Sequence, residues 1–447
     1  MGSDKDRFVT DTIFAVATGR GQAGIAVIRV SGPVAGVVFD RLAGQRPPPR
    51  HAVVRRLRTE AGLVIDEALC MWFPAPASFT GEDCVEFQCH GSSSVVALML
   101  ETIGRITDCR LAEPGEFSRR AFLNGRMDLT AVEGLADLID SETEQQRQQA
   151  LRQMLGGLSR EIDLWRDQLI GILALFEAEL DFSDENDVDR TVLRRAEGQL
   201  RNLSETMARS LAQGDRGEKI REGLTVMLAG PPNSGKSTLL NALARRDVAI
   251  VSPIAGTTRD IVEARLDLGG YAVRVLDTAG MRVTDDPIEQ EGVRRMLAQS
   301  EAADVVLWLN AAAMPHEAAP ASLVALGDRF MSVTTQIDRV EIEHDGLAVS
   351  ALTGARMDLL IRRLTEVASA EATSNAENAP LTRARHREAV GDAKMAIDRA
   401  LAGVDRVGAE LVAEDIRLAA RAVGRITGHV GVEAVLDQIF SQFCIGK

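Results

Sequence analysis

The residues between positions 230 and 237 have the types and spacing needed to hold the phosphates of a nucleotide. The segment Gly230-Pro-Pro-Asn-Ser-Gly-Lys-Ser237 fits the pattern G-x-x-x-x-G-K-[ST]. Glycines let backbone N–H groups turn towards phosphates, and the start of a following helix adds a favourable dipole. We expect Lys236 to reach the β- and γ-phosphates and Ser237 to ligate Mg²⁺. The predicted contacts in this loop are Asn233, Ser234, Gly235, Lys236, Ser237 and Thr238.

Two segments further along the chain have the chemistry that a terminal phosphate and its metal ion require. Asp277-Thr-Ala-Gly280 follows an apolar stretch, so its carboxylate can hold Mg²⁺ through water and the Gly280 N–H can sense the γ-phosphate. A simple turn after a strand is the alternative reading. Between this segment and the phosphate loop lies Gly256-Thr-Thr-Arg-Asp260, where we expect Thr258 to close over Mg²⁺ as a switch. Nucleotide contacts are therefore also predicted at Thr258, Asp277, Thr278, Ala279 and Gly280.

The segment Thr335-Gln-Ile-Asp338 stands where GTP-binding proteins carry Asn-Lys-x-Asp. Asp338 is kept, and its carboxylate can accept hydrogen bonds from guanine N1–H and N2–H₂. Thr335 and Gln336 replace the usual Asn and Lys, and their effect on guanine affinity stays open. Ser350-Ala-Leu352 occupies the place of Ser-Ala-Lys. Thr335, Asp338 and Ser350 are the predicted base contacts.

The sequence offers two charged candidates for the hydrolysis step. Ras-like proteins carry a Gln after the Asp-Thr-Ala-Gly segment to orient water, whereas Met281 stands here. Glu289 is close enough along the chain to serve instead, although a solvated charge at a helix start would look the same. Arg259 could act as a finger towards the phosphates, and a structural ion pair is an equal alternative.

The elements that must position these residues alternate between strands and helices. Apolar stretches at 224–229, 272–276, 304–310, 330–334 and 347–349 predict strands, and 238–244 predicts a helix. Residues 220–375 are therefore expected to form a doubly wound α/β domain with a mainly parallel sheet.

The sequence on either side of this domain has a different pattern of apolar residues. Residues 8–124 contain short apolar runs at 25–30, 64–73 and 85–89 and a helical stretch at 94–106, typical of a small α/β domain. One apolar stripe at helical spacing runs from Leu151 to Phe176 and predicts a single long helix, and another stripe runs from Leu193 to Leu211. The expected fold is multidomain, α/β plus all-α, with the nucleotide-binding domain inserted into the helical one. The expected boundaries are 1–124, 125–219, 220–375 and 376–447.

Composition limits the class of protein. The net charge of −14 over 447 residues argues against a large surface that grips nucleic acid by counterion release alone, but allows a local basic patch. The five cysteines form no Cys-x-x-Cys pair, which favours reduced thiols and a cytoplasmic location. Cys84, Cys89 and His90 fit no standard zinc spacing, so a buried strand is the preferred interpretation. No apolar run reaches membrane-spanning length, so no membrane association is expected.

Several further motifs resemble those of the MnmE (TrmE) family of tRNA uridine-modification GTPases, over essentially the whole length. They are Asp11-Thr-Ile, Ile28-Arg-Val-Ser-Gly32, Phe79-Thr-Gly-Glu-Asp83, Pro114-Gly-Glu-Phe-Ser-Arg-Arg-Ala-Phe-Leu-Asn124 and Phe443-Cys-Ile-Gly-Lys447. The resemblance implies an N-terminal folate-binding domain, a helical domain and an inserted Ras-like G domain. It also implies a homodimer through the N-terminal domain and a complex with a flavin-dependent partner, MnmG. Together they would modify C5 of the wobble uridine (U34) of tRNA with a one-carbon unit from 5,10-methylenetetrahydrofolate.

The resemblance also implies roles for single residues. Asn233, Ser252, Ile254 and Thr257 match the residues that hold K⁺, a fixed cation that can take the place of an arginine finger. Glu289 matches the catalytic glutamate that positions water. The folate-site positions are matched by Arg29, Glu86, Arg126 and Lys447, with Arg126 standing where Lys is common. Cys444 matches the family's C-terminal cysteine, and its role stays open.

Two other functions share some of these features. A ribosome-assembly GTPase would act as a binding switch and would carry a basic RNA-binding domain after the G domain, whereas 381–447 is mixed in charge. A folate-using one-carbon enzyme with a regulatory G domain is the third alternative. The sequence does not identify the tRNAs or the amine donor.

Overall fold

The chain forms two compact units in the computed structural model, one made of Met1–Ala136 with Gly424–Lys447 and the other of Asp137–Val423. The structure describes residues 11–19, 21–181, 190–250, 263–277, 300, 302–340, 346–372, 381–404, 406, 408–430, 436, 439–441, 443 and 445–446.

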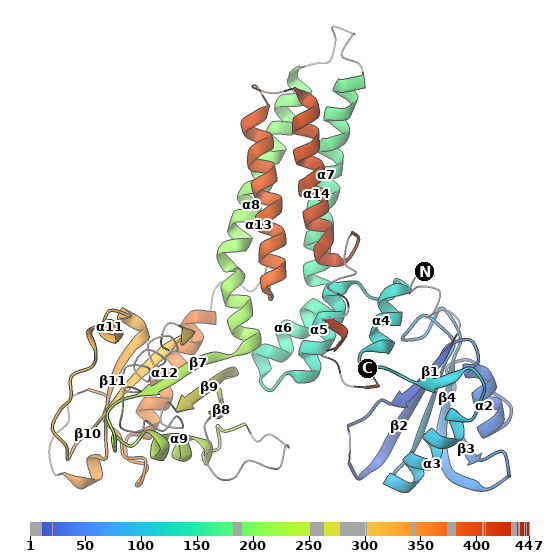
Figure 1. Ribbon diagram of the computed structural model, residues 1–447, viewed down its shortest axis with the longest axis horizontal. Helices are drawn as coiled ribbons and strands as arrows, with labels where there is room; N and C mark the ends of the chain where they lie inside the picture. The colour runs from blue at the N-terminus through green and yellow to red at the C-terminus, as the bar shows by residue number, and fades with distance from the viewer. Residues whose placement is uncertain are drawn as a thin grey trace, which may run out of the picture. The chain divides into compact units, whose positions relative to one another are not determined.

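The N-terminal unit is built on a six-stranded sheet (Figure 1). The strands lie in the order β3 (Val53–Arg58), β4 (Val64–Phe73), β5 (Cys84–Gly91), β2 (Ala23–Ser31), β1 (Thr12–Val16) and β6 (Cys109–Leu111). Neighbours are antiparallel except β1 and β6, which are parallel. The expected small α/β domain is confirmed, although the arginine-rich β3 was not foreseen.

Side chains along each strand alternate between the two faces of this sheet. Val85 and Phe87 of β5 point into a core that is covered by α2 (Ala35–Ala43) and α3 (Ser93–Gly104). Phe39 of α2 stacks on Phe87, with ring centroids 5.9 Å apart. Because side chains alternate along a strand, Glu86 faces the opposite side of the sheet.

The C-terminal stretch contributes to the same unit. Phe440 and Phe443 pack with Leu129 and Val132 of α5 (Leu129–Asp140). Ile445 forms an isolated antiparallel bridge with Pro114, just before α4 (Glu116–Leu123). Segments from both ends of the chain therefore build one core.

Four long helices lie side by side in the second unit (Figure 1): α7 (Gly157–Asp181), α8 (Arg190–Glu222), α13 (Ala384–Gly403) and α14 (Ala409–Thr427). Ser204 of α8 donates a hydrogen bond to Asp398 of α13 at 2.7 Å, across 194 residues of sequence. The two helical flanks thus form one bundle, and the α/β domain is inserted between them in the sequence, as predicted.

The expectation of one continuous helix from Leu151 to Phe176 is wrong. Helix α6 (Glu144–Met154) ends before Gly156, whose φ is +79°, and α7 then begins at Gly157. Leu155 falls at this break and is 62% exposed, whereas Leu158 is buried again. The apolar stripe is therefore shared by two helices.

The inserted domain has a five-stranded sheet, ordered β11 (Phe330–Thr335), β10 (Val305–Ala311), β7 (Leu224–Ala229), β9 (Tyr271–Asp277) and β8 (Glu263–Leu268). All neighbours are parallel except β8 and β9, which form an antiparallel hairpin. The predicted mainly parallel sheet is confirmed. The stretch 347–349 is only a bridge from Ala348 to Thr334 rather than a strand, and β8 was not foreseen.

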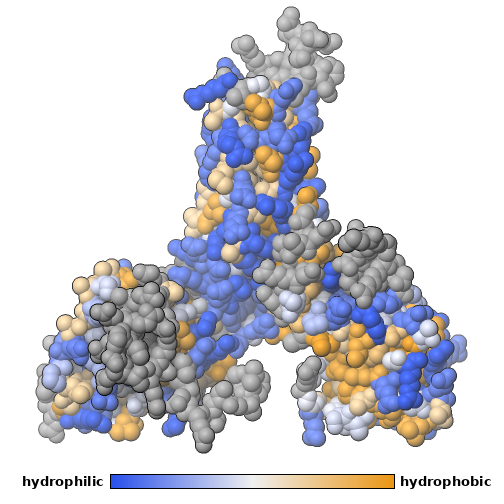
Figure 2. Space-filling model, in the orientation of Figure 1, coloured by the Kyte–Doolittle hydropathy of each residue, from blue (hydrophilic) through white to orange (hydrophobic). Residues whose placement is uncertain are grey.

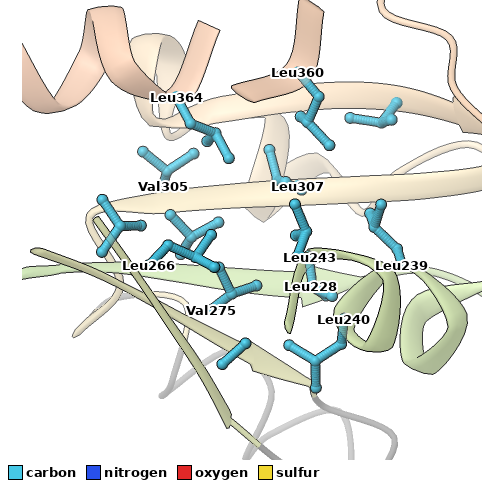
Figure 3. Packing of buried hydrophobic residues seen from close by; sticks show 14 of the residues in the cluster. Leu228, Leu239, Leu240, Leu243, Leu266, Val275, Val305, Leu307, Leu360 and Leu364 are labelled. Carbon is cyan, nitrogen blue, oxygen red and sulfur yellow. The ribbon is translucent and has the colours of Figure 1, made fainter. Parts of the chain in front are cut away.

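Helices cover both faces of this sheet. Figure 3 shows Leu239 and Leu243 of α9 (Lys236–Ala244) and Leu360 and Leu364 of α12 (Met357–Ala372) packing on one face. On the other face, Leu323 of α11 (Ala321–Val324) joins a smaller cluster. The carboxyl ends of β7, β9, β10 and β11 therefore meet at one edge of a rigid sheet, where ligands of such folds bind.

Candidate nucleotide-binding site and N-terminal site

The loop between β7 and α9 takes a backbone shape that requires glycine at two positions. Gly230 has a φ of +145°, and a Cβ there would lie 2.4 Å from the carbonyl oxygen of Leu309. Gly235 has a φ of +89° and directly precedes α9. Residues that carry a side chain rarely adopt such backbone angles. The two glycines therefore allow the loop to turn its backbone towards the helix N-terminus.

Lys236 is held over this loop. Its ammonium donates to the carbonyl oxygens of Gly230 and Pro231, both at 2.8 Å. Burial lowers the pKa of Lys236, and the charge of Asp277 opposes that shift. A buried ammonium held mainly by loop carbonyls is placed to donate hydrogen bonds to phosphate oxygens instead.

Ser237 and Asp277 are brought together from different elements. The Ser237 hydroxyl donates to Asp277 Oδ2 at 2.5 Å. Asp277 ends β9 and pairs with Leu228 of β7, which places its carboxylate beside the start of α9. A hydroxyl and a carboxylate are the hard oxygen ligands that Mg²⁺ prefers, so this donor set fits a Mg²⁺–nucleotide.

The predicted base-contact residues also come to this edge. Thr335 is buried and contacts Ser234, while Asp338 is exposed and accepts a hydrogen bond from the buried Ser350 hydroxyl at 2.5 Å. Gln336 contacts the phosphate loop as well, through Asn233. The sequence analysis noted Gln336 only as a departure from the usual Lys, because its contact with the loop depends on a left-handed backbone that the residue type does not reveal.

Several predicted site residues lie outside the described part of the chain. They are Ser252, Ile254, Thr257, Thr258, Thr278, Ala279, Gly280, Glu289, Cys444 and Lys447.

Arg29 and Glu86 form a half-buried ion pair in the N-terminal unit. They face each other across β2 and β5, and two guanidinium nitrogens of Arg29 lie 2.9 Å from Glu86 Oε1. The guanidinium also lies over the Phe79 ring, 4.6 Å from its centroid. The pair thus presents a cation and a carboxylate beside an aromatic wall.

Arg126 lies next to the loop that carries Phe79. A Cβ on Gly81 would lie 3.1 Å from Arg126 Cγ, and Asn124 donates to the Thr80 carbonyl at 2.8 Å. Arg29 and Arg126 therefore both lie beside the 79–81 turn.

A network of ion pairs next to this turn was not predicted from the sequence. Arg120, with a side chain only 1% exposed, binds Asp11, Glu82 and Glu116. Arg110 binds Asp11 and Glu116 as well. Burial opposes ionisation of Glu116, but hydrogen bonds and charges from the two arginines outweigh it and lower its pKa. The signal was present, because four of these five residues lie in the motifs quoted for the resemblance.

The cysteines take structural positions. Cys84 and Cys89 are each 2% exposed in β5, as the buried-strand interpretation expected. Burial raises the pKa of Cys70 to about 12. Across the described ranges, no cluster of His, Cys, Asp and Glu could hold a metal ion by itself. Within the same ranges, every helix is too short or too polar to cross a bilayer.

Comparison with known proteins agrees with this geometry. Residues 129–444 match the MnmE helical domain, and residues 12–126 match the N-terminus of the GTP-binding protein TrmE. A tRNA modification GTPase MnmE from Beijerinckia indica is 50% identical over 98% of this chain and 96% of its own length. Its counterpart from a Methylobacterium species is 51% identical over 98% of this chain and 100% of its own length. With a complete phosphate loop, a paired Ser237 and Asp277 and full-length similarity, the chain belongs to the MnmE (TrmE) family of tRNA modification GTPases.

Proposed function

We propose that this chain is a K⁺-stimulated GTP hydrolase that works with the flavoprotein MnmG to modify C5 of the wobble uridine, U34, of tRNA. The observation that carries the proposal is the pairing of Ser237 with Asp277 at 2.5 Å beside the buried Lys236. The membership of the family supports the tRNA substrate.

Different residues of the nucleotide site are proposed to bind the phosphates and the metal ion. Ser234, Gly235 and Thr238 lie at the turn into α9, where backbone N–H groups would bind phosphate oxygens. Ser237, with Thr258, would ligate Mg²⁺, and Asp277 would hold it through water. When bound, Mg²⁺ would neutralise charge on the phosphates. Thr278, Ala279 and Gly280 are proposed to sense the γ-phosphate.

The hydrolytic step is assigned to a fixed cation and a carboxylate. K⁺ would be held by Asn233, Ser252, Ile254 and Thr257. In support, Asn233 lies in the phosphate loop and is exposed. Glu289 is proposed to position the attacking water when the G domains of two chains dimerise with GTP and K⁺. Unchanged turnover in Glu289→Ala would remove that assignment.

A second substrate site is proposed in the N-terminal unit. Arg29, Arg126 and Lys447 would bind the glutamyl carboxylates of 5,10-methylenetetrahydrofolate, and Glu86 would accept from the pterin N–H edge. The Arg29–Glu86 pair, 19% exposed on each side chain, fits because a charged ligand can reach both groups. The bound folate would supply the one-carbon unit.

We propose a homodimer formed through the N-terminal unit. Figure 2 shows hydrophobic residues gathered on the visible face of this unit. Large apolar side chains that are exposed in this unit include Ile25, Val37, Val54, Leu63, Val64 and Leu111. A surface of this kind typically marks a protein contact. We further propose a cytoplasmic location and domain boundaries at 1–124, 125–219, 220–375 and 376–447.

The proposal is tested by nucleoside analysis of wobble uridines. A deletion strain would be complemented with the wild-type chain, with Ser237→Ala, or with Ser332→Ala, a control that changes an exposed serine on β11 of the same sheet. The modified uridine should return with the wild type and the control and stay absent with Ser237→Ala. Full modification in the uncomplemented strain would reject the tRNA function, and full rescue by Ser237→Ala would reject the nucleotide site.

A further inference from the structure

The Thr335 hydroxyl, at the end of β11, is directed at the phosphate loop. Thr335 is only 3% exposed, and its Oγ1 donates to the Ser234 carbonyl oxygen at 2.5 Å. The other acceptor within reach is the Asn310 carbonyl oxygen at 3.3 Å, in the neighbouring strand β10. A hydroxyl carries a single proton, so Thr335 has no second donor for a base.

Gln336 is directed at the preceding carbonyl of the same loop. Its backbone is left-handed, with φ 57° and ψ 36°, and this turns the side chain back. Nε2 then donates to the Asn233 carbonyl oxygen at 2.9 Å. A Cβ on Gly235 would lie 3.4 Å from both Gln336 Nε2 and Thr335 Oγ1. The two side chains therefore cover one glycine and hold two consecutive carbonyls.

Asp338 is placed differently. It is exposed, and the hydroxyl of the fully buried Ser350 donates a hydrogen bond to one of its carboxylate oxygens. A carboxylate can only accept, so it suits the donors of guanine and not its acceptors. Guanine presents N7 and O6 as acceptors on one edge and its N1–H and N2–H₂ donors on the other.

We infer, on the basis of the nucleotide site proposed above, that Thr335 and Gln336 clamp the phosphate loop and do not read the base. Of these residues, Asp338 then selects guanine through its N1–H and N2–H₂ donors, and neither Thr335 nor Gln336 donates to the N7 acceptor. Thr335 cannot donate to N7, because its single proton is used on the Ser234 carbonyl oxygen. An Asn at this place has two N–H donors and can serve both the loop and N7.

The test compares dissociation constants of the full chain for GDP, 7-deaza-GDP, which lacks N7, and IDP, which lacks the 2-amino group. We expect 7-deaza-GDP to bind within about twofold of GDP, and IDP to bind about tenfold more weakly, as for one lost hydrogen bond to a charged group. Thr335→Asn should introduce a preference of about fivefold for GDP over 7-deaza-GDP. A loss of fivefold or more for 7-deaza-GDP in the wild type, or equal binding of GDP and IDP, would overturn the inference.

The clamp is tested by removing the Thr335 proton while keeping the side-chain shape. Thr335→Val should weaken GDP and 7-deaza-GDP by the same factor, about fivefold to tenfold. Thr335→Ser keeps the proton and should bind like the wild type, which separates the clamp from a folding defect. Thr334→Val, one residue earlier on β11, is the matched control. If Thr335→Val weakens GDP but spares 7-deaza-GDP, the hydroxyl reads N7. If the wild type binds no GDP at all, the nucleotide site itself is rejected instead.

Discussion

The Ser237 hydroxyl and the Asp277 carboxylate lie 2.5 Å apart, although 40 residues separate them in sequence. The contact exists because β7 and β9 are parallel neighbours whose carboxyl ends meet. It sets the serine at the start of α9 against the one carboxylate at the end of β9. This pair defines where the metal ion of a bound nucleotide is expected.

Asp277→Asn should lower kcat for GTP hydrolysis by about 100-fold or more, because the variant loses a preorganised negative charge at the Mg²⁺ position. The Mg²⁺ concentration needed for half-maximal rate should rise at the same time. Both are measured by following phosphate release during Mg²⁺ titration, with Ser332→Ala as control. An unchanged Mg²⁺ requirement would show that Asp277 does not serve the metal ion.

Asn233→Gly should abolish stimulation by K⁺ over Na⁺ without straining the loop. Asn233 has a φ of +62°, which glycine adopts freely, so the substitution removes only the side-chain amide. The backbone carbonyl that Gln336 contacts is retained. Hydrolysis rates are compared in equal concentrations of the two salts. Wild-type rates that do not differ between K⁺ and Na⁺ would remove the cation from the proposal.

Much of the nucleotide site could be predicted because it depends on contiguous sequence. Gly230 to Ser237 is a local pattern, and the strand before it and the helix after it are visible in the same window. The part that could not be predicted depends on backbone shape. Gln336 contacts the loop only because its left-handed conformation turns the side chain back, and the residue type alone does not reveal this.

Arg29→Gln and Glu86→Gln should each weaken tetrahydrofolate binding by about tenfold or more, as expected for a lost hydrogen bond to a charged group. The matched control is Arg56→Gln, which breaks the exposed Arg56–Glu67 pair between strands of the same sheet. Binding is measured by isothermal titration of the full chain. If the control weakens tetrahydrofolate binding as much as Arg29→Gln does, the loss comes from the change in overall charge and not from a folate site at Arg29.

The N-terminal site illustrates a second limit of sequence reasoning. Arg29 and Glu86 are 57 residues apart, and nothing local marks them as partners. Only the register of β2 with β5 brings them opposite each other. The break at Gly156 was missed for a different reason: the pair Gly156-Gly157 is a turn signal, but the apolar spacing continues across it and favours an unbroken helix.

Gly115→Ala should destabilise the N-terminal unit more than Gly125→Ala. Both glycines have positive φ, +69° and +66°, so both variants carry a backbone cost of about 1–2 kcal/mol. A Cβ at 115 would also lie 2.6 Å from the Phe440 carbonyl oxygen, whereas the space around 125 is open to at least 4 Å. Hydrogen exchange of peptides from α4 in the full chain should therefore be faster in Gly115→Ala. Equal rates in the two variants would mean that the Phe440 segment does not pack here.

Glu116→Gln should destabilise α4 at neutral pH by about 3 kcal/mol, because it leaves the buried Arg120 guanidinium and the half-buried Arg110 guanidinium short of a counter-charge. The pKa of Glu116 is lowered from 4.5 in the folded unit, so its ionised form stabilises the fold fully above about pH 4.5. That contribution is lost as the pH falls through the lowered pKa. Asp11, whose pKa is lowered from 3.8 by the same arginines against the effect of burial, acts in the same direction. After correction for the intrinsic exchange rate, β1 and α4 should therefore exchange more slowly in the wild type than in Glu116→Gln, and this difference should shrink as the pH falls below about 4.5. A difference that stays constant down to pH 3 would mean that the charge of Glu116 does not stabilise the network.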